Sequence, residues 1–155
     1  MKKFLYYDPK LLLYGFSILF FASYGQTFFI SLFNTEIRIF YDLSDGEFGL
    51  VYSIATLSSS FLLISFAKLI DHLDLRVYSF IITLGFLLAC LGMVFLIKNI
   101  LYLFLIIFML RFFGQGAMDH AGGTTMARYF GNDKGKALSV ATLGGMLGVM
   151  FLPYF

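Results

Sequence analysis

The sequence predicts an all-α membrane protein, a polytopic helix bundle with about five transmembrane helices. Of its 155 residues, 60% are hydrophobic and only 13% are charged, and the mean hydropathy is +0.88. A soluble domain is about half apolar and about a quarter charged, so this chain has too little polar surface to cover a soluble globule. Its apolar runs also reach the roughly 20 residues that a helix needs to cross a bilayer. We expect residues 1–155 to form a single transmembrane domain.

The first expected helix, 11–33, follows a short basic head. Pro9 suits its start, because proline lacks an N–H that the first helical turn would leave unpaired anyway. The apolar run is too long for a signal peptide and shows no small-residue cleavage site, so we interpret it as a retained span. Residues 34–43 are polar and are expected to form a connector.

The second expected helix, 44–70, begins with the sequence Ser-Asp-Gly-Glu. This is the Ser-x-x-Glu pattern of a capping box, in which Ser44 accepts from the N–H of Glu47 and the Glu47 side chain accepts from the N–H of Ser44. A charged turn at 71–76 separates this helix from the third expected helix, 77–97.

The fourth expected helix, 100–126, follows a short Lys-Asn turn, and the fifth expected helix, 137–155, follows a polar loop at 128–136. Small residues repeat at four-residue spacing on the fifth helix, in the pairs Gly144 and Gly148, and Ala141 and Gly145. Such pairs permit close approach of a neighbouring helix, and we interpret them as packing residues.

Basic residues gather on one side of this topology. With the N-terminus inside, the inner segments carry Lys2, Lys3, Lys10, Lys68, Arg76, Arg128, Lys134 and Lys136. The outer segments carry Arg38 and Lys98. The positive-inside rule therefore predicts a multi-pass protein of the plasma (cell inner) membrane with a cytoplasmic N-terminus. Five spans would place the C-terminus outside.

The sequence offers little for other kinds of chemistry. Cys90 is the single cysteine, so the chain has no internal disulfide and no CxxC metal site. His72 and His120 are too scattered for a metal cluster. No nucleophile lies beside a base, and no phosphate-binding glycine loop is present. We therefore expect no enzyme activity, no metal, no cofactor and no nucleic-acid partner; the expected surroundings are the lipid bilayer.

Three polar residues interrupt the fourth expected helix. Arg111, Gln115 and Asp119 are spaced by four residues, so an α-helix places them on one face. A charged side chain at the centre of a membrane helix costs roughly 2.5–3.5 kcal/mol on insertion scales, and such residues usually face a protein interior or a water-filled cavity. Arg111 and Asp119 are about 12 Å apart along the axis and cannot pair directly, although Gln115 could bridge part of the gap.

Two interpretations of these polar residues stay open. They line a solute or proton pathway, or they form a structural polar network between helices. Asp119 could also serve at a helix end, and His120 beside it is either a proton relay or a hydrogen-bonded structural residue.

The first expected helix carries a second candidate polar face. Tyr24 and Ser31 lie at heptad spacing with Ser17, and Thr27 is nearby. Such a stripe can line a cavity, although serine and threonine in membrane helices often bond only to backbone or neighbouring helices. Tyr24, Thr27 and Ser31 are therefore further pathway candidates. Gln26 lies off this face, and the sequence assigns it no role.

The order of these features resembles the amino-terminal half of a major facilitator superfamily transporter. The family's loop between helices two and three has the pattern Gly-x-x-x-Asp-Arg-x-Gly-Arg-Arg, and residues 67–76 here read Ala-Lys-Leu-Ile-Asp-His-Leu-Asp-Leu-Arg. Asp71 and Arg76 match this pattern, and the resemblance implies that they belong to a gating loop. The departures are Ala67, His72, Asp74 and Leu75.

The fourth expected helix resembles the same family. Its Arg-Phe-Phe-Gly-Gln-Gly, residues 111–116, is similar to the family's arginine- and glycine-containing motif. The residues that follow are similar to the monocarboxylate porter branch: Tyr129-Phe130, Lys-Gly-Lys-Ala at 134–137, then Gly144, Gly145 and Gly148. That branch usually has Trp-Phe where this chain has Tyr129-Phe130.

The resemblance implies secondary transport by alternating access, by symport or antiport, of a small and anionic, monocarboxylate-like solute. A proton is the implied coupling ion. The resemblance covers about five of the family's usual twelve helices, so we expect a truncated or fragmentary chain that needs a C-terminal half or another copy. The alternative is a membrane remnant or accessory membrane subunit that does not transport.

Overall fold

The computed structural model describes residues 8–151 and shows helices without strands in that range. The elements are α2 (Pro9–Ala22), η1 (Ser23–Gly25), α3 (Thr27–Leu32), α4 (Asn34–Tyr41), α5 (Asp45–Phe66), η2 (Ala67–Asp71), α6 (Leu75–Val94), α7 (Ile100–Met109), η3 (Leu110–Met118), α8 (Asp119–Tyr129), η4 (Gly131–Asp133) and α9 (Lys134–Phe151). The expected all-α fold is confirmed.

Four helical segments in the described range are long and apolar enough to cross a membrane: Pro9–Leu32, Asp45–Asp71, Leu75–Val94 and Ile100–Tyr129. Each corresponds to one of the first four expected helices. The fifth expected helix corresponds to α9, which begins three residues earlier than expected, at Lys134. Its expected end at residue 155 lies outside the described residues, so a fifth span stays a prediction.

The first span is not the continuous helix that hydropathy predicts. α2 gives way to the 3₁₀ turn η1, Gln26 is extended at φ −76° and ψ 153°, and α3 then begins at Thr27. The break occurs where Gly25 packs against the fourth span: a Cβ on Gly25 would lie 2.5 Å from the Leu110 carbonyl oxygen and 2.7 Å from the Gly114 Cα. Backbone contact this close requires glycine.

The expected connector at 34–43 is mostly helical. α4 buries Ile37 and Tyr41 against α5 and α7 and exposes Thr35 and Glu36, so its helical period, rather than its average polarity, decides its structure. The helix ends at Asp42, which has a positive φ of 54°. Asp42 is thus a left-handed helix end, a position that aspartate tolerates better than most residues.

The predicted capping box at the start of α5 is confirmed. The Ser44 hydroxyl accepts from the Glu47 N–H at 3.3 Å, and the Glu47 carboxylate accepts from the Ser44 N–H at 2.8 Å. Two backbone donors that the first helical turn leaves unpaired are satisfied in this way.

The fourth span is helical from Ile100 to Tyr129, but its centre, η3, is a π-helix. A π-helix bonds each residue to the one five positions away, so the α-helical spacing from which one shared face was predicted does not hold through this segment. π-helical turns are frequent at functional sites. The irregular centre of this span meets the break in the first span at Gly25 and Gly114.

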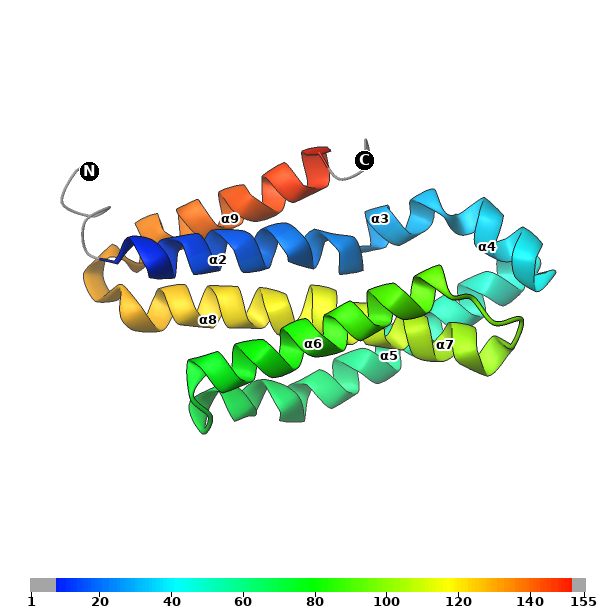
Figure 1. The fold of residues 1–155 in the computed structure, drawn as a ribbon, viewed down its shortest axis with the longest axis horizontal. Helices are drawn as coiled ribbons and strands as arrows, with labels where there is room; N and C mark the ends of the chain where they lie inside the picture. Colours follow the sequence, from blue (N-terminus) through cyan, green and yellow to red (C-terminus); the bar gives the residue numbers. More distant parts are fainter. Residues whose placement is uncertain (1–7, 152–155) are drawn as a thin grey trace.

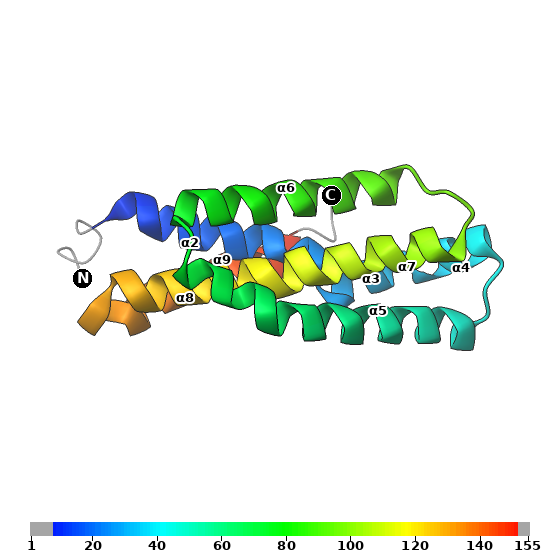
Figure 2. The same cartoon turned by 90° about the horizontal axis from the view of Figure 1, so that it is seen from below.

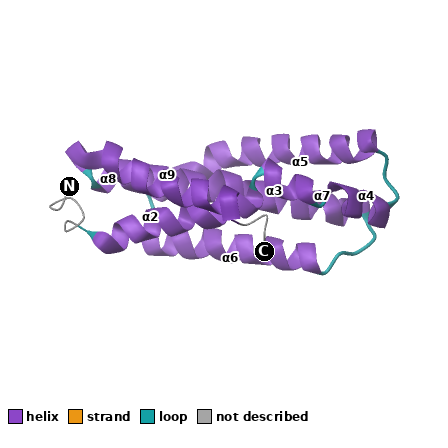
Figure 3. Cartoon of the chain, turned by 90° about the horizontal axis from the view of Figure 1, so that it is seen from above, coloured by secondary structure: helices purple, strands orange, loops and turns teal. Residues whose placement is uncertain are grey.

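The helices form an elongated bundle in which α2 lies beside α9 and α8 (Figure 1). Seen from below and above, α5 and α6 lie on opposite sides of the segment from α7 to α8 (Figures 2 and 3). α4 and the α6–α7 connection lie at one end of the bundle, and the α5–α6 and α8–α9 turns lie at the other (Figure 1).

Small residues on α9 allow it to pack closely on α2, as their spacing predicts. A Cβ on Gly144 would lie 2.1 Å from the Phe16 carbonyl oxygen, and one on Gly148 would lie 2.4 Å from Ser23 Oγ. The Ser23 hydroxyl also donates to the Gly145 carbonyl at 3.2 Å. Without a hydrophobic force between helices in lipid, such close contact is what holds two helices together.

Candidate functional site

Arg111 lies in the π-helix and reaches the break in the first span. Its Nη1 donates to Thr27 Oγ1 at 3.0 Å and to the Gly25 carbonyl at 3.4 Å. The break leaves the Gly25 carbonyl without a helical N–H, and inside a membrane such a group needs a partner from the protein. Arg111 is therefore half-buried against the part of the first span whose backbone lacks its own hydrogen-bond donor.

Tyr52 of α5 completes this side of the site. Its hydroxyl donates to Thr27 Oγ1 at 2.9 Å, and its ring lies below the Arg111 guanidinium, 5.5 Å from the guanidinium carbon. Cation–π contact and neutral acceptors are the partners of Arg111; no carboxylate between residues 8 and 151 forms an ion pair with it. The positive charge is held without being neutralised.

Asp119 also contacts this break. Its Oδ2 accepts from Gln26 Nε2 at 3.0 Å. Arg111 and Asp119 thus contact neighbouring residues of the first span, Thr27 and Gln26, and their place in a pathway stays a prediction. Gln26, to which the sequence assigned no role, is the partner of Asp119; the signal was a Gly-Gln pair inside an apolar run.

Gln115 does not bridge Arg111 and Asp119. Its Oε1 is buried and has no hydrogen-bond partner among the described residues, and neither has Arg111 Nε. The Gln115 backbone lies against Gly25, where a glycine Cβ would meet Gln115 N at 2.8 Å. Gln115 therefore contributes its backbone to the surface on which Gly25 packs.

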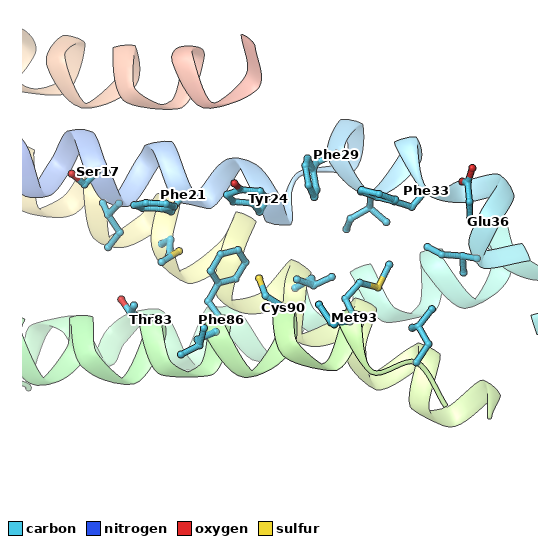
Figure 4. A pocket seen from close by; sticks show the side chains of 18 of the residues that line it. Ser17, Phe21, Tyr24, Phe29, Phe33, Glu36, Thr83, Phe86, Cys90 and Met93 are labelled. Carbon is cyan, nitrogen blue, oxygen red and sulfur yellow. The ribbon is translucent and has the colours of Figure 1, made fainter. Parts of the chain in front are cut away.

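Tyr24 lines an apolar groove of about 930 Å³ between α2–α3–α4 and α6 (Figure 4). Phe21, Phe29 and Phe33 line one wall, and Phe86 and Met93 line the other. Ser31 is not among the lining residues: it is exposed, and its hydroxyl donates to the Phe28 carbonyl of its own helix at 2.7 Å. The break between Tyr24 and Ser31 removes the heptad relation that the sequence suggested.

The model of the Major Facilitator Superfamily matches residues 15–155 of the chain. The chain belongs to the major facilitator superfamily. Neither the curated proteins nor the solved structures contain a significant match. Family membership and the four apolar spans make this a multi-pass membrane protein with a transport-type function.

The expected gating loop of this superfamily member lies at the end of the bundle opposite α4 (Figure 1). Asp71 forms an ion pair with Arg128 of α8, and Arg128 Nη1 also donates to the Ile70 carbonyl at 3.2 Å. Arg76 is exposed, and its backbone N–H donates to Asp74 Oδ1 at 2.7 Å. The two candidates are thus not joined to each other, and Asp71 instead ties the α5–α6 turn to the end of the fourth span.

Apart from Arg111 in η3, the described basic residues lie in segments near the two ends of the bundle. The start of α2, the α5–α6 turn and the α8–α9 turn, at one end, carry Lys10, Lys68, Arg76, Arg128, Lys134 and Lys136, whereas α4 and the α6–α7 connection, at the other end, carry Arg38 and Lys98 (Figure 1). There Arg38 pairs with Asp45, and Lys98 pairs with Asp42. Lys2 and Lys3 lie outside the described residues.

The described hydrogen-bond contact of His120 lies within its own helix. Its Nε2 lies 3.4 Å from the Thr124 hydroxyl on the same helix. In residues 8–151 of this superfamily member, no three His, Cys, Asp or Glu side chains come together as metal ligands would.

Proposed function

We propose that this superfamily member moves a small anionic solute, of monocarboxylate type, by alternating access. The observation that carries the proposal is the state of Arg111: a cation inside a span, held by a ring face and neutral oxygens and paired with no described carboxylate. An anion arriving at Arg111 would supply the missing charge. The planar guanidinium suits the two oxygens of a carboxylate.

Asp119 is the proposed proton carrier. It lies inside the fourth span, its described side-chain partner is the neutral Gln26 amide, and no described cation pairs with it. A carboxyl group in such a place accepts a proton at lower cost than one that a salt bridge keeps ionised. His120, beside Asp119 in sequence, is the second candidate carrier.

The proposed setting is the plasma membrane with the N-terminus in the cytoplasm. The excess of basic residues at the end of the bundle that holds Arg76, Arg128 and Lys134 supports this orientation. Thr27, which bonds to Arg111, is exposed, so the described helices do not cover this side of the site. We therefore propose that a C-terminal half or another copy of the chain supplies the opposite wall of the pathway.

The test is uptake of radiolabelled lactate and acetate into lipid vesicles that contain the protein, with and without an imposed proton gradient. Replacement of Arg111 by alanine is expected to lower the rate at least tenfold. The uptake rate of Arg111→Lys is expected to lie between those of the parent chain and Arg111→Ala, because lysine keeps the charge but loses the paired donors. The matched control is Lys10→Ala, which removes an exposed positive charge at the start of α2 and should leave uptake unchanged.

Equal uptake by the parent chain and Arg111→Ala would remove Arg111 from the mechanism. No uptake of either solute by the parent chain would contradict completion of the pathway by copies of this chain and favour the need for a C-terminal half or an accessory membrane subunit.

A further inference from the structure

One part of the first span can move against the rest. α3 is six residues long, with the extended Gln26 before it and Phe33, which interrupts the helix, after it. Thr27, Ser31 and Leu32 are exposed, and Ile30 is its one buried residue. A short helix between two breaks, with little buried surface, belongs to the least stable parts of a fold.

Ile30 packs α3 into the core, and one side chain, Thr27, carries its hydrogen bonds to other helices. Within residues 8–151, the side-chain hydrogen bonds that α3 makes to other elements all end on the Thr27 hydroxyl, which Arg111 and Tyr52 both approach as donors. Arg111 is also the group that would bind the solute. A carboxylate attracts the guanidinium by its charge and can accept two of its N–H groups at once, whereas the Thr27 hydroxyl accepts one, so an anion would displace Thr27 from Arg111.

Gln26 makes a second bond at the break between η1 and α3, which we call the joint. Its amide donates to Asp119 at 3.0 Å, and this bond does not involve Arg111. Arrival of an anion at Arg111 would therefore remove one of the two hydrogen bonds to Thr27 and loosen α3, while the Tyr52–Thr27 and Gln26–Asp119 bonds stay in place.

The groove beside α3 supplies room for movement. Phe29 of α3 and Phe33 at its end face Phe86 and Met93 of α6 across the groove of about 930 Å³ (Figure 4). All four side chains are apolar, so a movement of α3 toward α6 would bring them into van der Waals contact.

We propose that α3 is a gate that the solute releases, with the Arg111–Thr27 bond as its latch and Gln26 as the positioning residue that keeps the joint against Asp119. The release step rests on the proposed function, because it needs an anion at Arg111. The latch and the position of Gln26 can be tested without any solute.

The test measures the distance between spin labels on Leu32→Cys of α3 and Leu88→Cys of α6, in the full chain in lipid nanodiscs with Cys90→Ala. Both labelled positions are exposed, at 51% and 53%. Thr27→Val keeps the shape of the side chain and removes the acceptor. Since the Thr27 hydroxyl accepts from both Arg111 and Tyr52, this change is expected to raise the fraction of molecules at a label distance other than the main parent distance by at least about fivefold, the effect of losing one typical hydrogen bond.

The matched control is Ser31→Ala on the same helix, whose hydroxyl bonds only within α3. This variant is expected to give the parent distribution. Tyr52→Phe removes the second donor to Thr27 and should shift the distribution in the same direction as Thr27→Val, so the latch stays testable if one variant folds poorly. Parent-like distributions for both Thr27→Val and Tyr52→Phe would overturn the latch.

Gln26 is tested by rescue. Gln26→Leu and Asp119→Leu are each expected to broaden the distribution, and the double variant should broaden it no further than either alone. Asp119→Asn keeps an acceptor for the Gln26 amide and should restore the parent distribution. A broad distribution in Asp119→Asn would show that the hydrogen bond is not what positions the joint.

The release step is tested with lactate, at constant ionic strength, on protein whose uptake is measured in parallel. Lactate is expected to shift the parent distribution as Thr27→Val does and to have no effect on Arg111→Gln. Normal uptake without a shift would overturn the gate and keep the proposed function. Absent uptake with the Thr27→Val shift intact would overturn the proposed function and keep the latch.

Discussion

Gly144 of α9 lies against the backbone of Phe16 in α2, so close that a Cβ on the glycine would fall 2.1 Å from the Phe16 carbonyl oxygen. The obstacle is backbone rather than a flexible side chain, so it cannot move aside. This contact fixes the distance between two helices that are far apart in the sequence.

Replacement of Gly144 by alanine is therefore expected to separate α9 from α2. Overpacking of this kind costs about 1–3 kcal/mol of unfolding free energy. The measurement is a dodecyl sulfate titration in mixed micelles, followed by circular dichroism. Gly135→Ala is the control on the same helix, because a Cβ there would meet no atom within 4 Å; equal losses in both variants would contradict the packing argument.

Ser44→Ala is expected to destabilise the start of α5 by about 1 kcal/mol, because it removes one half of the capping box. The same titration measures this change. Ser60→Ala serves as the comparison, since the Ser60 hydroxyl donates only to the Thr56 carbonyl one turn earlier in α5. We expect its effect to be below about 0.5 kcal/mol. A Ser44 variant as stable as the Ser60 variant would mean that water replaces the cap.

The ion pair of Asp71 with Arg128 is exposed and is expected to contribute less than about 1 kcal/mol to stability. Arg128→Ala should cost more than Asp71→Asn, because Arg128 also donates to the Ile70 carbonyl. A double-mutant cycle on unfolding free energy measures the coupling, and salt should weaken it. A coupling above about 2 kcal/mol would show that the pair is shielded from water.

If the α5–α6 turn gates transport, as the family resemblance implies for Asp71 and Arg76, then Asp71→Asn should lower uptake by more than its small effect on stability explains. Arg76→Ala tests the second candidate in the same assay. Normal uptake by both variants would leave the turn a structural connection.

Hydropathy and capping predicted the bundle well, for local reasons. In lipid, the backbone N–H and C=O groups of an apolar run must hydrogen-bond to each other, and only a helix achieves this within one segment. The start of α5 follows from four consecutive residues, and the close approach of another helix to α9 follows from the spacing of Gly144 and Gly148. Both features depend on neighbours in the sequence, whereas the choice of α2 as the partner of α9 does not.

The break at Gln26 and the π-helix from Leu110 to Met118 depend on each other across the bundle, and no local pattern encodes them. Gly25 can approach Gly114 because both lack a Cβ, yet each glycine alone looks like a tolerated helix residue. Gln26 found its partner, Asp119, only in three dimensions. The roles of the candidate pathway residues accordingly stay predictions, whereas their positions are known.

The bond between Arg111 and the Gly25 carbonyl has a consequence for biosynthesis. The two residues are 86 positions apart, so the first span leaves the ribosome long before its partner exists. Until then the Gly25 carbonyl has no protein donor, and Arg111 in turn enters the membrane as a costly lone charge. Arg111 donates a hydrogen bond to the Gly25 carbonyl, and the carbonyl gives the buried guanidinium an acceptor. Their contact is therefore a late, long-range step in assembly. A chain interrupted before the fourth span would present the quality-control machinery with an exposed backbone break in its first helix.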